Sequence, residues 1–373
     1  MKLILAVDAL IPPLTGIGRY AWELASHYQA CSKEFDSIRY YFADRWIADP
    51  ADMLQGLGSE AVTPTRDRGF FRAPKSWRRW RMQRDLRQHV FHSPNYFLPE
   101  SVDGGIVTVH DLSVFKYPET HPAARIKHFE SGFASTLKRA AHLITDSEAI
   151  RAEVIDYFGW SPTRITAIGL GARQEFRPRS AHEIAAELNE HGLVHGEYSL
   201  CVSTLEPRKR IDRLLAAYLD LPSSLRTRYP LVLAGSTGWL SDALREQIER
   251  GEREGWLRYL GFVEEAFLPL LYSGARAFLF PSIYEGFGLP VLEAMASGIP
   301  TLTSNCSSLP EVADGAAWLV EPDDHKLLRD GIELVLCDET WRRAATARGL
   351  HVASTVSWER CAKRTLAVCR RFG

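Results

Sequence analysis

The chain has 373 residues, of which 45 are Lys or Arg and 46 are Asp or Glu, so its formal net charge at pH 7 is −1. This balance argues against a general nucleic-acid-binding protein, which would carry an excess of basic residues. Because single hydrophobic cores stop growing at roughly 250–300 residues, the length predicts two domains.

Six cysteines are scattered along the chain, with no Cys-x-x-Cys pair and no cluster with histidine at zinc spacing. This pattern predicts reduced thiols and no structural metal. The N-terminal apolar run is too short for a signal peptide, and no stretch reaches the roughly 18 apolar residues that cross a bilayer. We therefore expect a cytoplasmic protein.

The first elements are a strand over residues 3–7 and an amphipathic helix over 20–28. Gly16 and Gly18 lie where that helix would begin, and glycines there let backbone N–H groups approach a diphosphate. A plain tight turn is at least as common an explanation for a single Gly-x-Gly.

Residues 66–87 form a basic stretch with nine Arg or Lys against two Asp, hence a local charge of 9 − 2 = +7. Aromatic residues are interleaved with these charges, at Phe70, Phe71, Trp77 and Trp80. Such a segment could lie on an anionic bilayer surface, or it could be a solvated helix whose tryptophans face the core. Nucleic acid is a weaker third option, because no RNA- or DNA-binding motif accompanies the charge.

Further strands are predicted over residues 90–94, 105–109, 143–145 and 164–168. His110 directly follows the second of these, which places it at the carboxyl end of a strand, where α/β sheets bind ligands. A lone histidine is nevertheless more often structural than functional.

The second half of the chain continues with strands over residues 198–202, 231–235, 258–263 and 318–320, and a last helix over 358–371. Arg208 and Lys209 follow the first of these strands. Two fixed cations there would stabilise the charge on a departing diphosphate, whereas the alternative is an ordinary surface turn.

Residues 278–300 combine a buried strand at 278–280, a glycine-rich loop and a helix that begins near Pro290. The N-terminus of that helix would attract an anion such as a phosphate. Glu285 lies on the loop and Glu293 on the helix, 293 − 285 = 8 positions later. Both carboxylates could reach one ligand, although each alone could be a solvated surface acid.

Three segments resemble the signature segments of the retaining glycosyltransferases of family 4: E-G-F-G-L-P-V-L-E-A-M-A-S-G-I-P at 285–300, T-V-H-D-L-S-V-F-K-Y-P-E at 108–119 and T-L-E-P-R-K at 204–209. The resemblance implies an α/β GT-B fold, in which two Rossmann-like, doubly wound domains face each other across a cleft. It implies an N-terminal acceptor domain over residues 1–177, a nucleotide-sugar donor domain over 178–356, and a helix over 357–373 that crosses back to the first domain.

The branch of the family with T-L-E-P-R-K includes mannosyl- and rhamnosyltransferases of bacterial surface polysaccharides. The resemblance therefore implies transfer of a hexose from a nucleoside diphosphate sugar, GDP-mannose first, to a glycan or lipid-diphosphate-linked acceptor in O-antigen-like synthesis. No protein nucleophile is evident, so front-face substitution is expected. No cofactor and no metal are expected. Nucleic acid is not expected as a partner, and an anionic membrane surface is a candidate partner through residues 66–87.

Family roles carry over to matching positions. His110 would contact the donor sugar near its 6-position, Glu285 would lie against the sugar and phosphates, and Glu293 would hold the ribose. The implied catalytic residues are His110, Lys209 and Glu285, and the implied substrate-binding residues are Gly16, Gly18, Thr204, Arg208, Val263, Gly286, Phe287, Gly288, Leu289 and Glu293.

One departure from the family pattern concerns the loop at residues 203–209. Many family members have a Gly-Arg pair where this chain has Ser203 and Thr204. Either Arg208 supplies the missing guanidinium, or Lys209 alone holds the phosphates.

Two rival functions from other classes remain open from the sequence, and so does one enzyme that shares the fold. A glycoside hydrolase would also use two carboxylates, but it has no reason for cations and a helix N-terminus at the same point. A non-catalytic nucleotide-sugar-binding protein would lose His110 or Lys209, and both are present. A UDP-sugar 2-epimerase shares the fold, and only analysis of the reaction product would exclude it fully.

Overall fold

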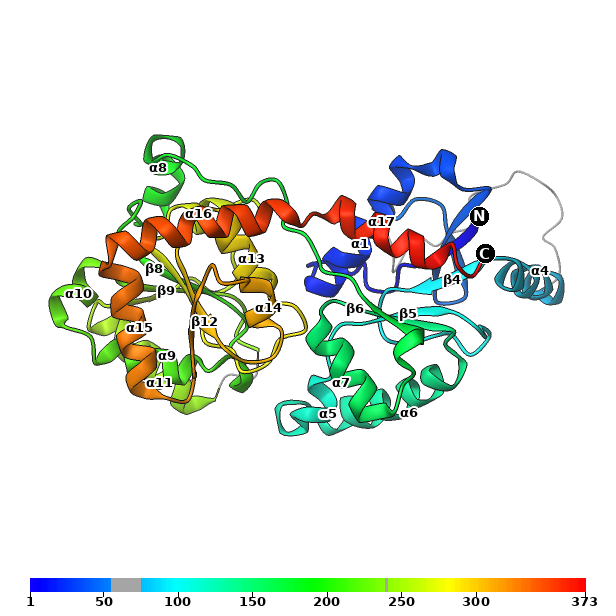
Figure 1. Ribbon diagram of the computed structural model, residues 1–373, viewed down its shortest axis with the longest axis horizontal. Helices are drawn as coiled ribbons and strands as arrows, with labels where there is room; N and C mark the ends of the chain where they lie inside the picture. Colours follow the sequence, from blue (N-terminus) through cyan, green and yellow to red (C-terminus); the bar gives the residue numbers. More distant parts are fainter. Residues whose placement is uncertain (55–74, 239–240) are drawn as a thin grey trace. The chain divides into compact units, whose positions relative to one another are not determined.

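The computed structural model describes residues 1–54, 75–238 and 241–373, and its chain divides into two compact units (Figure 1). Unit 1 comprises residues 1–112, 123–170 and 358–373, and unit 2 comprises 113–122 and 171–357. The division therefore falls after Leu170, not after residue 177. The short segment 113–122 also belongs to unit 2, although its neighbours on both sides belong to unit 1.

The described part of unit 1 contains a seven-stranded sheet in the order β3-β2-β1-β4-β5-β6-β7. All its neighbouring strands are parallel except β2 and β3. The strand order reverses between β1 and β4, which makes the sheet doubly wound. The strands are β1 (Lys2–Ala6), β2 (Ser37–Phe42), β3 (Arg45–Ile47), β4 (Val90–Ser93), β5 (Ile106–Val109), β6 (His142–Thr145) and β7 (Ile165–Ala167).

The longer helices of unit 1 are α1 (Gly16–Ala30), α4 (Lys75–Gln88), α6 (Ala123–Arg139), α7 (Glu148–Phe158) and α17 (Trp358–Cys369). Shorter ones are α2 (Ala51–Leu54), η1 (Ser32–Glu34) and η3 (Pro162–Arg164). Side-chain caps fix two of the helix starts: the hydroxyl of Thr15 accepts from Gly18 N, and that of Ser147 accepts from Ile150 N.

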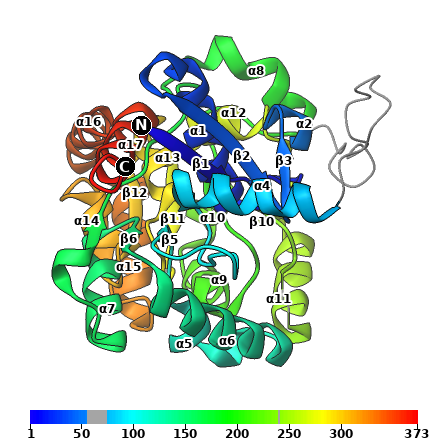
Figure 2. The same ribbon diagram turned by 90° about the vertical axis from the view of Figure 1, so that its right-hand side faces the viewer.

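The C-terminal helix α17 packs against α1, as the two views in Figures 1 and 2 show. The ring centroids of Trp358 and Tyr20 lie 6.4 Å apart. The last helix of the chain therefore completes the unit in which the chain begins.

Unit 2 has, among its described residues, a six-stranded parallel sheet in the order β10-β9-β8-β11-β12-β13. The strands are β8 (Ser199–Val202), β9 (Leu231–Ala234), β10 (Leu257–Tyr259), β11 (Ala277–Phe280), β12 (Thr301–Ser304) and β13 (Trp318–Val320). The order reverses between β8 and β11. In open α/β sheets this reversal marks the place outside the strands' carboxyl ends where ligands bind.

The longer helices of unit 2 are α8 (Ala181–Glu190), α9 (Ile211–Leu219), α11 (Asp242–Arg253), α13 (Leu289–Ala296), α15 (His325–Cys337) and α16 (Glu339–Thr355). Single-turn and short helices are α5 (Ser113–Lys116), η2 (Pro118–Thr120), η4 (Pro207–Lys209), α10 (Ser223–Arg228), α12 (Leu268–Ser273) and α14 (Leu309–Ala313). Helices cover the sheet, so β11 is buried along its whole length.

The structure corrects several predicted elements. The strand predicted over 258–263 ends at Tyr259, and residues 260–263 form a loop. Strands β2, β3 and β12 were not predicted, because their sequences mix polar with apolar residues and lack a continuous apolar run. The basic stretch is helical from Lys75, and its residues 66–74 lie outside the described residues.

Candidate active site

The candidate site follows from two neighbouring strands of unit 2. Strands β8 and β11 pair in parallel, with Ala277 opposite Ser199 and Phe278 opposite Leu200. The chain leaves β8 toward the turn η4 and leaves β11 toward the loop that ends at Gly288, so both predicted segments lie at one edge of the sheet. The structure thereby brings together Arg208, Lys209 and Glu285.

Lys209 and Glu285 form a buried ion pair. Lys209 Nζ lies 2.5 Å from Glu285 Oε1, and the residues are 7% and 9% exposed. The ammonium also lies 5.3 Å from the ring centroid of Phe280, on the preceding strand. This burial excludes both an ordinary surface turn at Lys209 and a solvated loop acid at Glu285.

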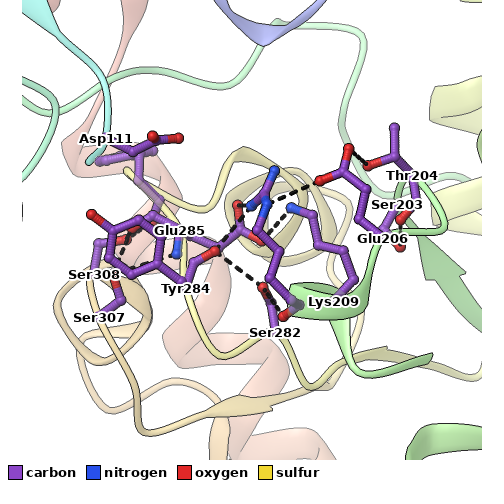
Figure 3. Close-up of polar contacts among 12 residues, drawn as sticks. Asp111, Ser203, Thr204, Glu206, Lys209, Ser282, Tyr284, Glu285, Ser307 and Ser308 are labelled. Carbon is purple, nitrogen blue, oxygen red and sulfur yellow. Dashed lines mark hydrogen bonds and ion pairs between the residues drawn. The ribbon is translucent and has the colours of Figure 1, made fainter. Parts of the chain in front are cut away.

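Arg208 ties the two loops together through the other side of the same carboxylate. Its Nη1 lies 3.6 Å from Glu285 Oε2 and donates a 3.0 Å hydrogen bond to the backbone oxygen of Tyr284. Its Nε donates to Glu206 Oε2 at 3.0 Å, and Glu206 Oε1 accepts from the hydroxyl of Thr204 at 2.9 Å (Figure 3). The sequence analysis missed Glu206, although it lies inside the quoted T-L-E-P-R-K segment.

The charges of this cluster depend on burial and on the opposed ions. Burial on its own raises the pKa of Glu285, but Lys209 and Arg208 outweigh it and hold that pKa below its ordinary value. Burial, with Arg208 adding to it, lowers the pKa of Lys209 against the attraction of Glu285. Glu285 is therefore an anion that lies between Arg208 and Lys209 and holds both cations in place.

Serine hydroxyls fix the backbone of the Glu285 loop. Ser307 donates to the backbone oxygen of Glu285 at 2.7 Å (Figure 3). The hydroxyl of Ser308 lies 2.9 Å from the same oxygen and 2.7 Å from that of Phe287, so its single proton is shared between these two acceptors. On the other side, Ser282 donates to the backbone oxygen of Arg208 at 3.2 Å. These serines were not predicted; the only signal was the polar loop after β12.

The segment 113–122 packs against the same loop. Tyr284 is 1% exposed, and its ring centroid lies 5.1 Å from that of Tyr117. Lys116 Nζ lies 5.1 Å from the same ring. The residue before Glu285 is therefore held by side chains that are distant in sequence.

Helix α13 begins beside this cluster, at Leu289. Gly288, which precedes it, has φ 112° and ψ 45°, and a Cβ there would lie 2.8 Å from Leu309 Cδ2. A side chain would therefore be strained at Gly288. Gly286 and Phe287 lie on the loop that leads to this helix start, where the positive end of the helix dipole favours an anion.

Glu293 lies on α13, half-buried, next to the buried Tyr272 of α12. Burial, followed by the charge of Glu293, raises the pKa of Tyr272 well above its ordinary value. Val263 lies on the loop after β10, the edge strand of the sheet, beside Phe262, which is 64% exposed. None of the contacts described above joins Val263 to the cations.

The remaining predicted residues belong to unit 1. Gly16 and Gly18 form the first turn of α1, and a Cβ on Gly18 would lie 2.8 Å from the backbone oxygen of Ala9. Close packing therefore requires glycine at position 18. His110 follows β5, where its Nδ1 lies 2.7 Å from Asp146 Oδ2 and its Nε2 lies 2.8 Å from the backbone oxygen of Pro94.

Within residues 1–54, 75–238 and 241–373, no group of three or more His, Cys, Asp or Glu is arranged to hold a metal ion. The helices of this same part of the chain include none with the length and apolar character needed to cross a bilayer. All six cysteines lie in described segments, and each is a free thiol.

Two doubly wound α/β units are the architecture of the GT-B fold, and solved structures agree in fold. Anabaena HepE in complex with UDP-glucose superposes with a TM-score of 0.74 at 16% identity, covering 100% of both chains. WaaG, a glycosyltransferase involved in lipopolysaccharide biosynthesis, gives 0.72 at 16% identity over 98% of this chain and 99% of that one. The predicted fold class is confirmed.

Sequence comparison gives the family. Residues 185–351 match the family model described as glycosyl transferases group 1. The chain is 38% identical to O-antigen chain mannosyltransferase B of Escherichia coli, over 98% of each chain. It is 32% identical to the serotype-specific mannosyltransferase WbdA of Escherichia coli over 72% of its length, and spans 34% of that longer protein. The chain belongs to the group 1 glycosyltransferases, which confirms the predicted family and enzyme class.

Proposed function

We propose that this enzyme is a retaining mannosyltransferase of O-antigen synthesis, which transfers mannose from GDP-mannose to a hydroxyl of a glycan or lipid-linked oligosaccharide. The observation that carries the proposal is the 38% identity to O-antigen chain mannosyltransferase B across 98% of both chains. The buried cations of unit 2 supply the chemistry that such a donor requires.

The donor diphosphate would bind at Arg208, Lys209 and the N-terminus of α13. These groups lie at one sheet edge, already ordered by Glu285 and the serine hydroxyls. Hydrogen-bond donors and cations that are fixed before the reaction need no reorganisation when charge develops on the leaving diphosphate. Since these cations and the helix N-terminus already neutralise phosphate, we propose that no metal takes part.

Contacts to the rest of the donor follow from the family resemblance. Glu293 would accept hydrogen bonds from the ribose hydroxyls, and Tyr272 beside it would limit the movement of its carboxylate. The backbone at Val263 would meet the base. His110 of unit 1 would act on the sugar through its charge, because both of its ring nitrogens already have hydrogen-bond partners within unit 1.

The transfer would proceed on one face of the sugar. The bond from the anomeric carbon to the diphosphate oxygen breaks while a bond to the acceptor oxygen forms on the same side. The acceptor proton moves to the departing phosphate oxygen, so no protein nucleophile is needed. Lys209 and Arg208 stabilise the negative charge that builds on that phosphate.

Helix α4 suggests where the enzyme would meet a lipid-linked acceptor. Trp80 is 58% exposed, and the guanidinium of Arg84 lies 5.5 Å from its ring centroid. Arg81 and Arg87 are also exposed on this helix. We propose that this face binds the anionic cytoplasmic surface of the membrane, because an amphipathic ring beside several cations suits a bilayer interface.

The test is a transfer assay with GDP-mannose and a mannose-terminated, lipid-linked acceptor. We expect one GDP for each mannose transferred, and an α-linked product by NMR that retains the donor configuration. Release of free sugar from an oligosaccharide without any nucleotide would support a hydrolase instead. Thermal stabilisation by GDP and GDP-mannose, but not by UDP or ADP, would identify the donor class.

A further inference from the structure

A second buried pair of titratable residues, His110 and Asp146, lies in unit 1. Strands β5 and β6 pair with Val109 opposite Thr145, so the residues that follow both strands meet. His110 is 6% exposed and Asp146 is 3% exposed. Both ring nitrogens of His110 have an oxygen within hydrogen-bond distance, whereas Asp146 Oδ1 has no hydrogen-bond partner among the described residues.

The partners determine how many protons the pair holds. A backbone carbonyl can only accept, so Nε2 of His110 must donate to Pro94. The contact between Nδ1 and Asp146 Oδ2 needs one more proton. Burial raises the pKa of Asp146, while the charge of His110 and its hydrogen bond oppose that rise. The pKa of His110 is also raised. Because the ordinary pKa of imidazole, about 6.5, lies well above that of an aspartic acid, about 3.9, the proton is placed on the ring. His110 is then an imidazolium, and Asp146 is its carboxylate.

The charged and polar neighbours agree with this assignment. Burial on its own would lower the pKa of His110, but Asp146, the Pro94 carbonyl and Asp111 outweigh it and raise that pKa. Burial, followed by the charge of His110, lowers the pKa of His92 to about 3. His92 is therefore neutral near pH 7, and His110 does not share its charge with it.

Aromatic rings enclose the imidazolium. The ring centroids of Tyr20 and Tyr96 lie 5.2 and 5.6 Å from that of His110, each nearly perpendicular to it. Burial raises the pKa of both phenols well above the ordinary value, so they remain neutral. Burial, followed by the charge of Asp146, raises the pKa of Cys361 on α17, so this residue remains a thiol. The charge of Arg125 on α6 lowers the pKa of Tyr96, but burial outweighs it. Asp146 is thus the principal anion that faces His110.

We propose that Asp146 is a positioning residue, which holds His110 as an imidazolium with its ring fixed against Pro94, and that sugar transfer requires this fixed charge. The second part rests on the proposed function, whereas the ion pair itself forms without substrate. A cation that cannot rotate is a preorganised electrostatic element at the carboxyl end of β5.

Nitrogen NMR of the full chain tests the ion pair directly. The ring nitrogens of His110 would be assigned as the signals that disappear in His110→Gln. We expect a doubly protonated ring throughout pH 6–8 in the wild type, and a singly protonated ring above pH 7 in Asp146→Asn. A neutral wild-type ring at pH 7, or an unchanged ring in Asp146→Asn, would overturn the proposal.

Steady-state kinetics test whether sugar transfer requires the fixed charge of His110. Asp146→Asn should lower kcat/KM at pH 7.5 by at least tenfold, with partial recovery as the pH falls, while the Kd for GDP stays within twofold. The double variant His110→Gln/Asp146→Asn should be no slower than His110→Gln alone, because Asp146 acts through the ring. Asp156→Asn, on the exposed face of α7, is the matched control and should behave as the wild type.

The possible failures are separable. If the wild type transfers no sugar, the proposed function fails, and NMR still decides on the ion pair. If Asp146→Asn matches the wild type at every pH, the positioning role is overturned. Should Asp146→Asn not fold, Asp146→Glu replaces it: we expect a retained imidazolium with reduced kcat, and a neutral ring in the folded Glu variant would contradict the proposal.

Discussion

Lys209 donates a 2.5 Å hydrogen bond to Glu285 across two loops 76 positions apart in sequence, and both residues are more than nine-tenths buried. The pair would order the proposed diphosphate site before any sugar donor binds, because the carboxylate holds together two cations that would otherwise repel each other. A diphosphate would therefore enter a site whose positive groups are already in position.

Replacing Glu285 with Gln should reduce both activity and stability. The change leaves Lys209 without its charged partner, and breaking one side of a buried ion pair typically costs about 3–5 kcal/mol. We expect a lower Tm that saturating GDP restores in part, because the diphosphate replaces the lost anion. Thermal unfolding with and without GDP measures this, with Glu246→Gln on α11 as an exposed control. A Tm equal to that of the wild type would contradict the role of the pair.

The same pair predicts a pH dependence. The folded-state pKa of Glu285 lies below its ordinary value of 4.5, so its stabilising effect is complete above that value and disappears as the pH falls through the folded-state pKa. The stability difference between the wild type and Glu285→Gln should therefore be constant from pH 6 to 7 and shrink in acid. Chemical unfolding of both proteins at several pH values measures this difference. A difference that grows in acid would contradict a lowered pKa of Glu285 in the folded state.

Lys209→Met keeps much of the aliphatic chain and removes the charge. If Lys209 stabilises the leaving diphosphate in the transition state, kcat should fall by roughly 100–1000-fold, as it does when a preorganised electrostatic donor is lost. GDP affinity should fall by about tenfold or less, because Arg208 and α13 remain. Steady-state kinetics and calorimetry separate the two quantities. A loss of affinity with kcat unchanged would show uniform binding instead.

Glu293→Gln should weaken GDP binding by roughly 10–100-fold, since hydrogen bonds to a charged group contribute about 1.5–3 kcal/mol. Tyr272→Phe should have a smaller effect in the same direction, because it only loosens the carboxylate. Calorimetry with GDP and with guanine, which lacks the ribose, distinguishes the roles. Guanine binding should be unchanged in both variants, and an equal loss for guanine would remove the assignment to ribose.

The triple variant Arg81→Ser/Arg84→Ser/Arg87→Ser should sediment less with anionic vesicles than the wild type. Each basic residue near such a surface contributes about 1 kcal/mol. Arg245→Ser/Arg250→Ser/Arg253→Ser, on α11, removes the same charge from another exposed helix and should sediment normally. If both triple variants lose binding equally, net charge explains the attraction and α4 has no special part.

Sequence reasoning succeeded where local motifs coincide with strand ends. Arg208, Lys209 and Glu285 lie within a few residues of β8 and β11, and parallel pairing of those strands brings the loops to one edge. The helix start after Gly288 was also readable, because glycine followed closely by proline is a local signal.

The missed features depend on partners that no local pattern reveals. Asp146 meets His110 from 36 positions away, and the serines at 307 and 308 donate to backbone oxygens, which carry no sequence information. Strand β2 pairs in parallel with β1, a partner that its own mixed composition does not reveal. The contact of Gly18 with a phosphate stays a prediction, and a steric reason for glycine at this position appears only once Ala9 is in place.

The membership of residues 113–122 in unit 2 changes how the protein can be divided. The chain passes between the units after Leu112, after Pro122, after Leu170 and after Ser357. A fragment that stops at Leu170 would carry Tyr117 without its partner Tyr284 and would lack α17, whose Trp358 packs near Tyr20. Neither half is therefore a self-sufficient module that could be exchanged between related enzymes by a single cut. A functional chimera would have to transplant this ten-residue excursion and the terminal helix along with the halves that they complete.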